Sequence, residues 1–214
     1  LNGNLILEAD NMFVGWQVDV KQFVKAGSNE LKIFFHSPVR RGLAKLQALD
    51  YLIPSINEQA PVNERTSVFT RKAPFHYGWD WGPRLVTSGV WRPVKLKAWH
   101  DAVMQDVYIE TRAVSKELAS LSGKVTVDVE VPGRYTLSLL INGKPSGMKQ
   151  RLDLDKGIND FNFDFDIKNP SLWWTNGLGE AYMYDFTFRL EGVNLLADKY
   201  NLSYGVRTLH LVQE

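Results

Sequence analysis

Along the second half of the chain, hydrophobic and polar residues alternate, which is the pattern of strands that bury one face. The alternating segments are short and separated by turn signals, and they cover residues 107–109, 125–131, 135–141, 161–167 and 186–190. Asn142-Gly143 between two of them indicates a hairpin, because both positions of such a turn require positive φ. With no helical pattern of convincing length among them, these segments predict an antiparallel sandwich of immunoglobulin type.

The first third of the chain is also expected to be rich in strands. Asn2-Gly3 predicts another hairpin turn ahead of the apolar residues 5–7, and residues 19–24 favour a short helical turn. Residues 30–35 alternate as a strand, and residues 94–98 alternate as a closing strand. In the earlier strand the side chains expected to face inward are Leu31, Ile33 and Phe35.

The alternation disappears in residues 37–67. Residues 40–49 predict a short helix, and the prolines and polar residues after it indicate an excursion too long for a simple connection. Loops of this length are usually functional or disordered, and this one leads directly into a tryptophan-rich segment. A boundary near Asp101 divides the chain into two expected domains, residues 1–101 and 102–214.

The segment 71–93 gathers aromatic rings, charged groups, glycines and prolines, and it begins RKAPFHYGWDWGPR. Its frequent glycines and prolines exclude a long helix and indicate a shaped loop. Aromatic faces beside hydrogen-bonding groups suit a sugar, which has apolar C–H faces and a rim of hydroxyls. Each ring alone has packing as its alternative role, but Asp80 lies between Trp79 and Trp81 and would be costly to desolvate without a partner or ligand.

Three stretches of the sequence resemble β-mannosidases of glycoside hydrolase family 2. Residues 71–94, which contain GWDWGPR and TSGVWRPV, resemble the signature of that family's N-terminal sugar-binding-like domain. Residues 169–179 and 204–208 resemble the end of its immunoglobulin-like sandwich. The resemblance implies an all-β fold in which a partial galactose-binding-like jelly roll is followed by an immunoglobulin-like β-sandwich.

The same resemblance assigns roles to residues of the loop. It implies that Trp79, Asp80 and Trp81 bind the substrate, a β-mannoside or manno-oligosaccharide, beside a TIM-barrel domain of the same polypeptide. The residues expected to support this loop are His76, Arg84 and Arg92. The two arginines either orient the Asp80 carboxylate through charge-assisted hydrogen bonds or anchor the loop to its domain.

No catalytic residue is expected in this chain. The resembled enzymes cleave the glycosidic bond with retention, using two glutamates of the barrel, and 214 residues are too few for a jelly roll, a sandwich and a barrel. The Asn-Glu pairs that end at Glu30, Glu58 and Glu64 lie in a turn and a polar loop, so none is assigned catalysis. We therefore expect an inactive fragment of a retaining β-mannosidase. The alternatives are a stand-alone carbohydrate-binding protein and a structural or adhesin-type sandwich.

The resemblance also bears on how each half folds. The resembled family has jelly-roll strands ahead of Leu1, so residues 1–101 are expected to associate with another copy through strand exchange or to stay partly mobile. Trp173 and Trp174 are expected to pack against a neighbouring domain rather than to form a ligand platform, because adjacent strand residues point to opposite faces.

Composition narrows the remaining classes. The formal net charge of +1 gives no electrostatic support for binding nucleic acid or an anionic membrane. The sequence has no cysteine, and its 4 histidines lack metal-ligand spacing, so no metal site, thiol chemistry or cofactor is expected. No apolar run is long enough for a membrane span and no signal peptide is visible. A periplasmic or extracytoplasmic place in a bacterium is the expected location.

Overall fold

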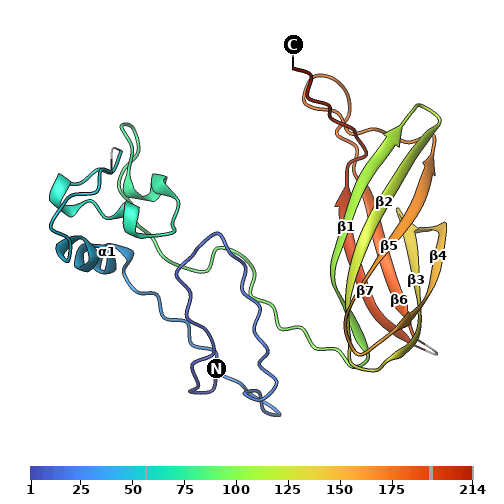
Figure 1. Ribbon diagram of the computed structural model, residues 1–214, viewed down its shortest axis with the longest axis horizontal. Helices are drawn as coiled ribbons and strands as arrows, with labels where there is room; N and C mark the ends of the chain where they lie inside the picture. The colour runs from blue at the N-terminus through green and yellow to red at the C-terminus, as the bar shows by residue number, and fades with distance from the viewer. Residues whose placement is uncertain (56, 193–194, 214) are drawn as a thin grey trace. The chain divides into compact units, whose positions relative to one another are not determined.

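A computed structural model describes residues 1–55, 57–192 and 195–213 of the chain (Figure 1). The chain divides into two compact units, Leu1–Lys95 and Leu96–Glu214. Among the described residues, both β-sheets belong to the second unit, whereas the first contains one α-helix and three short 3-10 helices. The tryptophan-rich segment lies in the first unit.

The second unit is a sandwich of two antiparallel sheets. One sheet has the strand order β1-β2-β5 and the other has the order β4-β3-β6-β7. The strands are β1 (Ala102–Val114), β2 (Leu118–Val129), β3 (Gly133–Ile141), β4 (Lys144–Leu154), β5 (Gly157–Lys168), β6 (Tyr184–Glu191) and β7 (Leu196–Tyr204). This arrangement confirms the predicted immunoglobulin-type sandwich.

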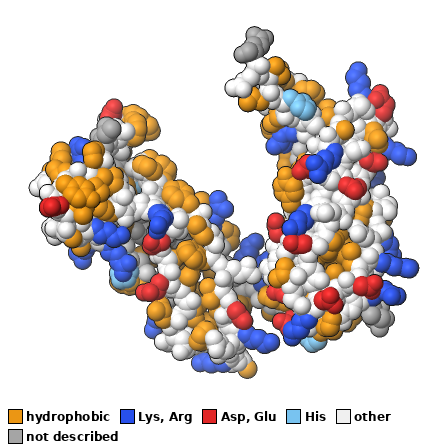
Figure 2. All heavy atoms as spheres, viewed as in Figure 1, with side chains coloured by type: hydrophobic (Ala, Val, Ile, Leu, Met, Phe, Trp, Pro, Cys, Tyr) orange, Lys and Arg blue, Asp and Glu red, His pale blue; other side chains and the backbone are white. Residues whose placement is uncertain are grey.

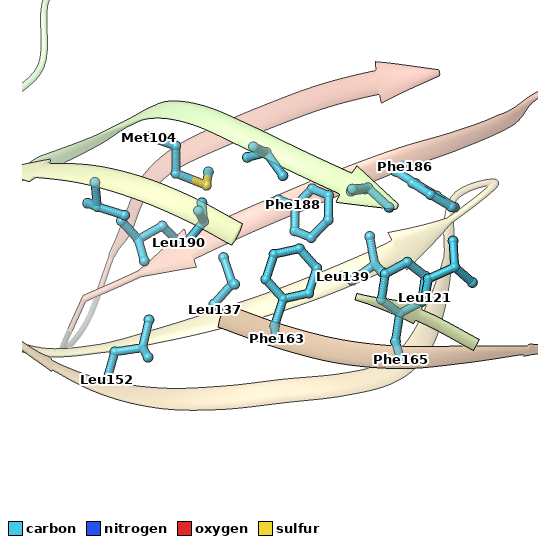
Figure 3. Close-up of a cluster of buried hydrophobic side chains, with 14 of the residues drawn as sticks. Met104, Leu121, Leu137, Leu139, Leu152, Phe163, Phe165, Phe186, Phe188 and Leu190 are labelled. Carbon is cyan, nitrogen blue, oxygen red and sulfur yellow. The ribbon is translucent and has the colours of Figure 1, made fainter. Parts of the chain in front are cut away.

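The hydrophobic core of the second unit lies between the facing sheets. Along β2, buried residues alternate with more accessible ones, and Val125 and Val127 are fully buried. Phe163 of β5 and Phe188 of β6 come from opposite sheets, and their ring centroids are 5.2 Å apart (Figure 3). Each fully buried side chain of this size stabilises the fold by about 1.5 to 3 kcal/mol. The alternation in the sequence therefore corresponds to the buried and solvent faces of these strands.

Two strands, β4 and β7, were not anticipated from the pattern. In β4 the buried residues Leu152 and Leu154 stand at one end of a strand that is otherwise exposed or half-buried. In β7 no residue is fully buried, although Tyr200 pairs with Phe188 of β6. Both strands bury few residues, so their apolar alternation is weak and backbone pairing at the sheet edge places them.

Two polar contacts stabilise the sandwich, one between β3 and the connection that precedes it and one between the two sheets. The Tyr135 hydroxyl donates to the Val131 carbonyl oxygen over 2.6 Å, and burial, with the negative charge of Asp101, raises the pKa of this hydroxyl. The backbone N–H of Met104 in β1 donates to the Asp198 carboxylate of β7 over 2.8 Å. Because β1 and β7 belong to different sheets, this bond joins the two layers.

In the first unit, α1 (Pro38–Gln47) confirms the helix predicted at residues 40–49. The Ser37 hydroxyl caps its start by accepting from the Arg40 N–H over 3.3 Å, and proline fits the first turn, whose N–H has no helical partner. The helix buries Leu46. Three 3-10 helices follow, η1 (Val62–Glu64), η2 (Ser67–Phe69) and η3 (Pro74–Tyr77).

Two local turns of the first unit also match their predictions. Asn2 and Gly3 have φ angles of 50° and 85°, and the Asn4 N–H donates to the Leu1 carbonyl over 2.9 Å. Residues 19–24 contain a helical turn in which the Val24 N–H donates to a carbonyl four residues earlier over 3.2 Å. Glycine and asparagine tolerate the positive φ of such turns at little cost.

The strands predicted in the first part of the chain are wrong, since the structure forms none at residues 5–7, 30–35 and 94–98. Asn2 and Glu30 do meet, because the Asn2 N–H donates to the Glu30 carbonyl over 2.9 Å, but no strand pairing follows in the described residues. The side chains expected to face inward are instead about half exposed: Leu31 48%, Ile33 50% and Phe35 47%. A strand needs a neighbour for its backbone groups, and alternation alone does not supply one.

Candidate functional site

The candidate site is the tight turn that follows η3, and we call residues 79–82 the site turn. Gly78 ends η3 with a φ of 94°, a conformation that side chains with a Cβ rarely adopt. The Trp79 N–H then donates to the Gly82 carbonyl over 3.0 Å, and the Gly82 N–H donates back to the Trp79 carbonyl over 3.2 Å. This reciprocal pair closes the turn and leaves its two middle residues at the tip.

The two tip residues, Asp80 and Trp81, are exposed. The exposed fraction is 87% for Trp81 and 38% for Trp79. Within residues 1–55, 57–192 and 195–213, no hydrogen bond or ion pair engages the Asp80 carboxylate. Asp80 is therefore not desolvated by its tryptophans, and the desolvation cost considered from the sequence does not arise. At the tip of a turn the side chains diverge into solvent rather than enclosing one another.

Arg84 anchors the exit of the site turn. Its Nη2 donates to Glu58 Oε1 over 3.1 Å, and the two side chains are 26% and 1% exposed, respectively. The guanidinium also lies 5.8 Å from the ring centroid of Tyr77. Of the two roles considered for this arginine, the structure shows anchoring rather than contact with Asp80.

Glu58 is buried within a set of hydrogen-bond donors. Its Oε2 accepts from the backbone N–H groups of Thr66 (2.7 Å) and Ser67 (2.8 Å) and from the Ser55 hydroxyl (3.4 Å). Burial by itself raises the pKa of the Glu58 carboxyl, but the hydrogen bonds from Ser67, Arg84 and Thr66 outweigh it, and the pKa lies below its usual value. The site turn is therefore tied to a carboxylate that stays ionised.

Gln59 anchors the entrance of the site turn. Its backbone N–H donates to the Tyr77 carbonyl over 3.0 Å, and its side-chain amide donates to the Trp79 carbonyl. A Cβ added at Gly78 would lie 2.8 Å from the Gln59 Cβ, so the two backbones approach too closely for any other residue there. Adjacent residues thus hold the two ends of the turn.

A small group of buried residues lies next to the anchoring residues Glu58 and Gln59. Tyr77 is fully buried and its hydroxyl shares a 2.6 Å hydrogen bond with the Thr70 hydroxyl. Burial is the main cause of the raised pKa of the Tyr77 hydroxyl. Helix α1 packs on Thr66 at Gly42, where an added Cβ would lie 2.5 Å from the Thr66 Cβ. The helix therefore fixes one of the two backbone donors of Glu58.

The other two residues expected to support the loop lie elsewhere. His76 is half-buried beside Phe75, with ring centroids 4.5 Å apart. The Arg92 guanidinium lies 4.4 Å from the Trp91 ring centroid, in a cation–π contact. Neither residue has a hydrogen bond or ion pair to Asp80 among the described atoms.

The arrangement offers an unengaged carboxylate and an open aromatic ring on a firmly anchored turn. Such a carboxylate can accept hydrogen bonds from two hydroxyls, and such a ring can cover an apolar sugar face. The described residues hold no group of three or more histidine, cysteine, aspartate or glutamate side chains arranged for a metal ion. No helix among them is long and apolar enough to cross a membrane.

The sequence located the turn and one of its anchors, Arg84, but did not identify Glu58 or Gln59 as anchors. Glu58 entered only as a carboxylate of an Asn-Glu pair without a catalytic role, and Gln59 was not singled out. Their contacts join residues about 20 to 26 positions apart, such as Glu58 to Arg84 and Gln59 to Trp79. A buried carboxylate in a polar loop carries no local signal of such a partner.

The second unit has an apolar pocket of about 210 Å³. Its lining includes Trp173, Trp174, Leu178 and Leu209, and the guanidinium of Arg207 lies 4.4 Å from the Trp173 ring centroid. That the tryptophans here pack against a neighbouring domain stays a prediction.

Two family models match the chain. Residues 1–92 match the model described as the glycosyl hydrolase 2 galactose-binding domain-like family, and residues 102–207 match glycosyl hydrolases family 2. Together these models cover the site turn and all seven strands of the described sandwich.

Individual relatives are β-mannosidases by name. Beta-mannosidase B of Aspergillus oryzae and that of Thermothelomyces thermophilus are each 33% identical to the chain over its full length. The crystal structure of a beta-D-mannosidase from Dictyoglomus thermophilum matches 98% of the chain with 32% identity and a TM-score of 0.80. The chain covers 25%, 24% and 25% of these three proteins, so it spans about a quarter of their length.

Proposed function

Because the chain belongs to glycosyl hydrolase family 2, we propose that it is the non-catalytic N-terminal part of a retaining β-mannosidase acting on terminal β-D-mannosides. Similarity to proteins named β-mannosidases over essentially the whole chain supports this assignment. In this proposal the TIM barrel and its two catalytic glutamates belong to the remainder of the parent polypeptide. Residues 1–101 and 102–214 are its first two domains.

The observation that carries the proposal for the site is the state of Asp80. Its carboxylate is exposed and unengaged among the described residues, while the turn that presents it is held at both ends. An anchored turn with an unengaged acceptor at its tip suits a ligand rich in hydroxyl groups. We assign Asp80 to accept hydrogen bonds from the sugar.

The tryptophans complete the proposed subsite. Trp81 offers an almost fully exposed ring, and Trp79 is partly exposed. An aromatic ring stacked on a sugar buries the apolar C–H face, while the carboxylate binds the hydroxyl rim. The substrate class is therefore a β-mannoside or manno-oligosaccharide, which meets the site turn at the mouth of the barrel.

The assignment is tested by following hydrolysis of an aryl β-mannoside by the full-length enzyme with proton NMR. We expect β-mannose as the first product, because a retaining enzyme inverts the anomeric centre twice. The 214-residue chain alone should show no turnover. The α anomer as first product, or turnover by the chain alone that depends on a single carboxylate, would contradict the proposal.

A further inference from the structure

The irregular loop before the site turn is held together by hydrogen bonds from one of its own side chains. The Arg65 side chain folds back across it, donating from Nη1 to the Ser55 carbonyl over 2.6 Å and from Nε to the Ala60 carbonyl over 3.1 Å. These bonds tie Ser55 and Ala60, which lie on either side of residues 57–59, to a single side chain. Glu58 and Gln59 lie in the segment between them.

The side chains of Glu58 and Gln59 have different targets. Glu58 is directed into the buried donors and reaches Arg84, two residues after the site turn. Gln59 is exposed at the surface and reaches the Trp79 carbonyl, at the first residue of the turn. The adjacent residues Glu58 and Gln59 therefore hold both ends of the site turn, which lies about 20 residues later in the sequence.

We propose that Glu58 and Gln59 are the positioning residues of the site turn and set the orientation in which Asp80 and Trp81 meet the sugar. The role toward the sugar rests on the proposed function. The positioning of the turn itself rests only on the contacts of Glu58 and Gln59 described above. Neither residue touches the proposed ligand, since both act through the backbone or through Arg84.

The tip residues Asp80 and Trp81 do not fix their own orientation, so residues at the ends of the turn must do so. Both tip side chains are exposed, and Asp80 has no hydrogen bond or ion pair among the described residues. The backbone bonds between Trp79 and Gly82 fix the shape of the turn but not its orientation. Orientation depends on what holds the two ends, and Gln59 and Arg84 with Glu58 are the side-chain contacts found there.

The surroundings of the Arg84 guanidinium are a second reason to assign a positioning role to Glu58. Its Nε is buried and has no hydrogen-bond partner in the part of the chain that the structure describes. Glu58 is its ionic partner, so removing the Glu58 charge leaves a largely buried cation uncompensated. Arg84 would then turn toward solvent and carry the exit of the site turn with it.

Isosteric variants of the full-length enzyme test the proposal. Gln59→Glu replaces the donor to the Trp79 carbonyl with a charged acceptor, and Glu58→Gln removes the charge opposite Arg84 and replaces one acceptor oxygen with an NH2 group. Glu64→Gln is the control, because Glu64 is an exposed carboxylate of the same loop. Amide hydrogen exchange of peptides covering residues 77–85 reports the turn without requiring activity.

We expect both variants to speed exchange at residues 77–85 by roughly three- to tenfold, the effect of losing one hydrogen bond. Exchange in the sandwich should stay unchanged, as should exchange around residues 38–47 in Gln59→Glu and all exchange in the Glu64→Gln control. Unchanged exchange at residues 77–85 would overturn the proposal. So would equal acceleration throughout the first unit in Gln59→Glu, which would show a general role in folding.

Kinetic coupling tests the link to the sugar. Gln59→Glu should lower kcat/KM by roughly three- to tenfold in the parent enzyme but by less than about twofold once Asp80→Ala is present. Equal losses in both backgrounds would overturn positioning through Asp80. Gln59→Ala, which has no amide to donate to the carbonyl, should behave like Gln59→Glu.

The two failures are distinguishable. If exchange responds as expected but Asp80→Ala leaves kcat/KM unchanged, the proposed role of Asp80 in binding the sugar fails and the positioning of the turn stands. If Asp80→Ala lowers kcat/KM while the Glu58 and Gln59 variants change neither exchange nor kinetics, the site assignment stands and the positioning role is overturned.

Discussion

Glu58 shows how a carboxylate can be buried and still remain ionised. Only 4% of the residue is exposed, which disfavours its charge, yet two backbone N–H groups and the Arg84 guanidinium favour it. The hydrogen bonds outweigh the burial, so the carboxyl pKa in the folded chain lies below its ordinary value of 4.5. Asp80 differs in kind, because solvent surrounds it and no protein group competes for its oxygens among the described residues.

The lowered pKa of Glu58 predicts an acid-sensitive first unit. Its contribution to stability is complete above its unfolded pKa near 4.5 and is lost as the pH falls through the lower folded pKa. Urea unfolding of the first unit, followed between roughly pH 3 and pH 7, should show this loss on the acidic side. Glu58→Gln should be less stable at neutral pH by about 1 to 3 kcal/mol and should flatten the acidic slope. An acidic slope unchanged by Glu58→Gln, or flattened equally by Glu64→Gln, would contradict the assignment.

Strand β2 is the central strand of its sheet, and its neighbours pack most closely against it at a glycine. Gly123 pairs with Ile109 of β1 and Phe163 of β5. A Cβ added at Gly123 would lie 2.3 Å from Phe163 Cζ and 2.6 Å from the Tyr108 carbonyl oxygen. The ring can shift, but the carbonyl belongs to a paired strand and cannot move without disturbing the ladder.

Gly123→Ala should therefore destabilise the sandwich by about 1 to 3 kcal/mol through overpacking. The control is Gly192→Ala, whose added Cβ would meet its nearest neighbour, Tyr135, at an ordinary 3.6 Å. Thermal unfolding of the second unit measures both variants. Equal melting temperatures for the two would show that the sheet accommodates the methyl group at Gly123.

The same elements show how far the sequence predicts the fold. Alternation located β2, β3, β5 and β6 because these strands bury one face in the core. It failed for residues 30–35, where the apolar positions exist but no strand pairs with them in the described chain. Alternation reports a capacity to bury one face, whereas a strand also requires a partner that no local pattern encodes.

The candidate site was predictable to a similar degree. The spacing of glycine and tryptophan located the site turn, since those residue types have local conformational and chemical meanings. Arg84 was expected to support the turn, but its partner Glu58 and the second anchor Gln59 were not predictable, because their contacts depend on how two distant segments pack. The solvent exposure of Asp80 was not predictable either, because solvation is a property of the folded turn.

The two units of the molecule differ in composition and in proposed role. The second unit contains the two sheets and the large buried cluster, in which Leu137 and Phe188 are fully buried. The first unit carries the site turn and exposes many apolar side chains, and hydrophobic atoms are visible over much of its surface in Figure 2. In the proposed enzyme the sandwich supplies stability, and the first unit supplies a shaped contact for the sugar.

Asp80 is the proposed hydrogen-bond acceptor for the mannoside. This role is tested by kcat/KM and the melting temperature of Asp80→Ala in the full-length enzyme, both measured on one sample. Asp50→Ala serves as the control, because Asp50 is exposed in the same unit. A charged acceptor is worth about 1.5 to 3 kcal/mol, so kcat/KM should fall roughly ten- to more than a hundredfold, and Asp80→Asn should lose less. The melting temperature should not change, since the Asp80 carboxylate is exposed and has no partner among the described residues. A kcat/KM within about threefold of the parent, or a fall in melting temperature that accounts for the lost activity, would contradict the assignment.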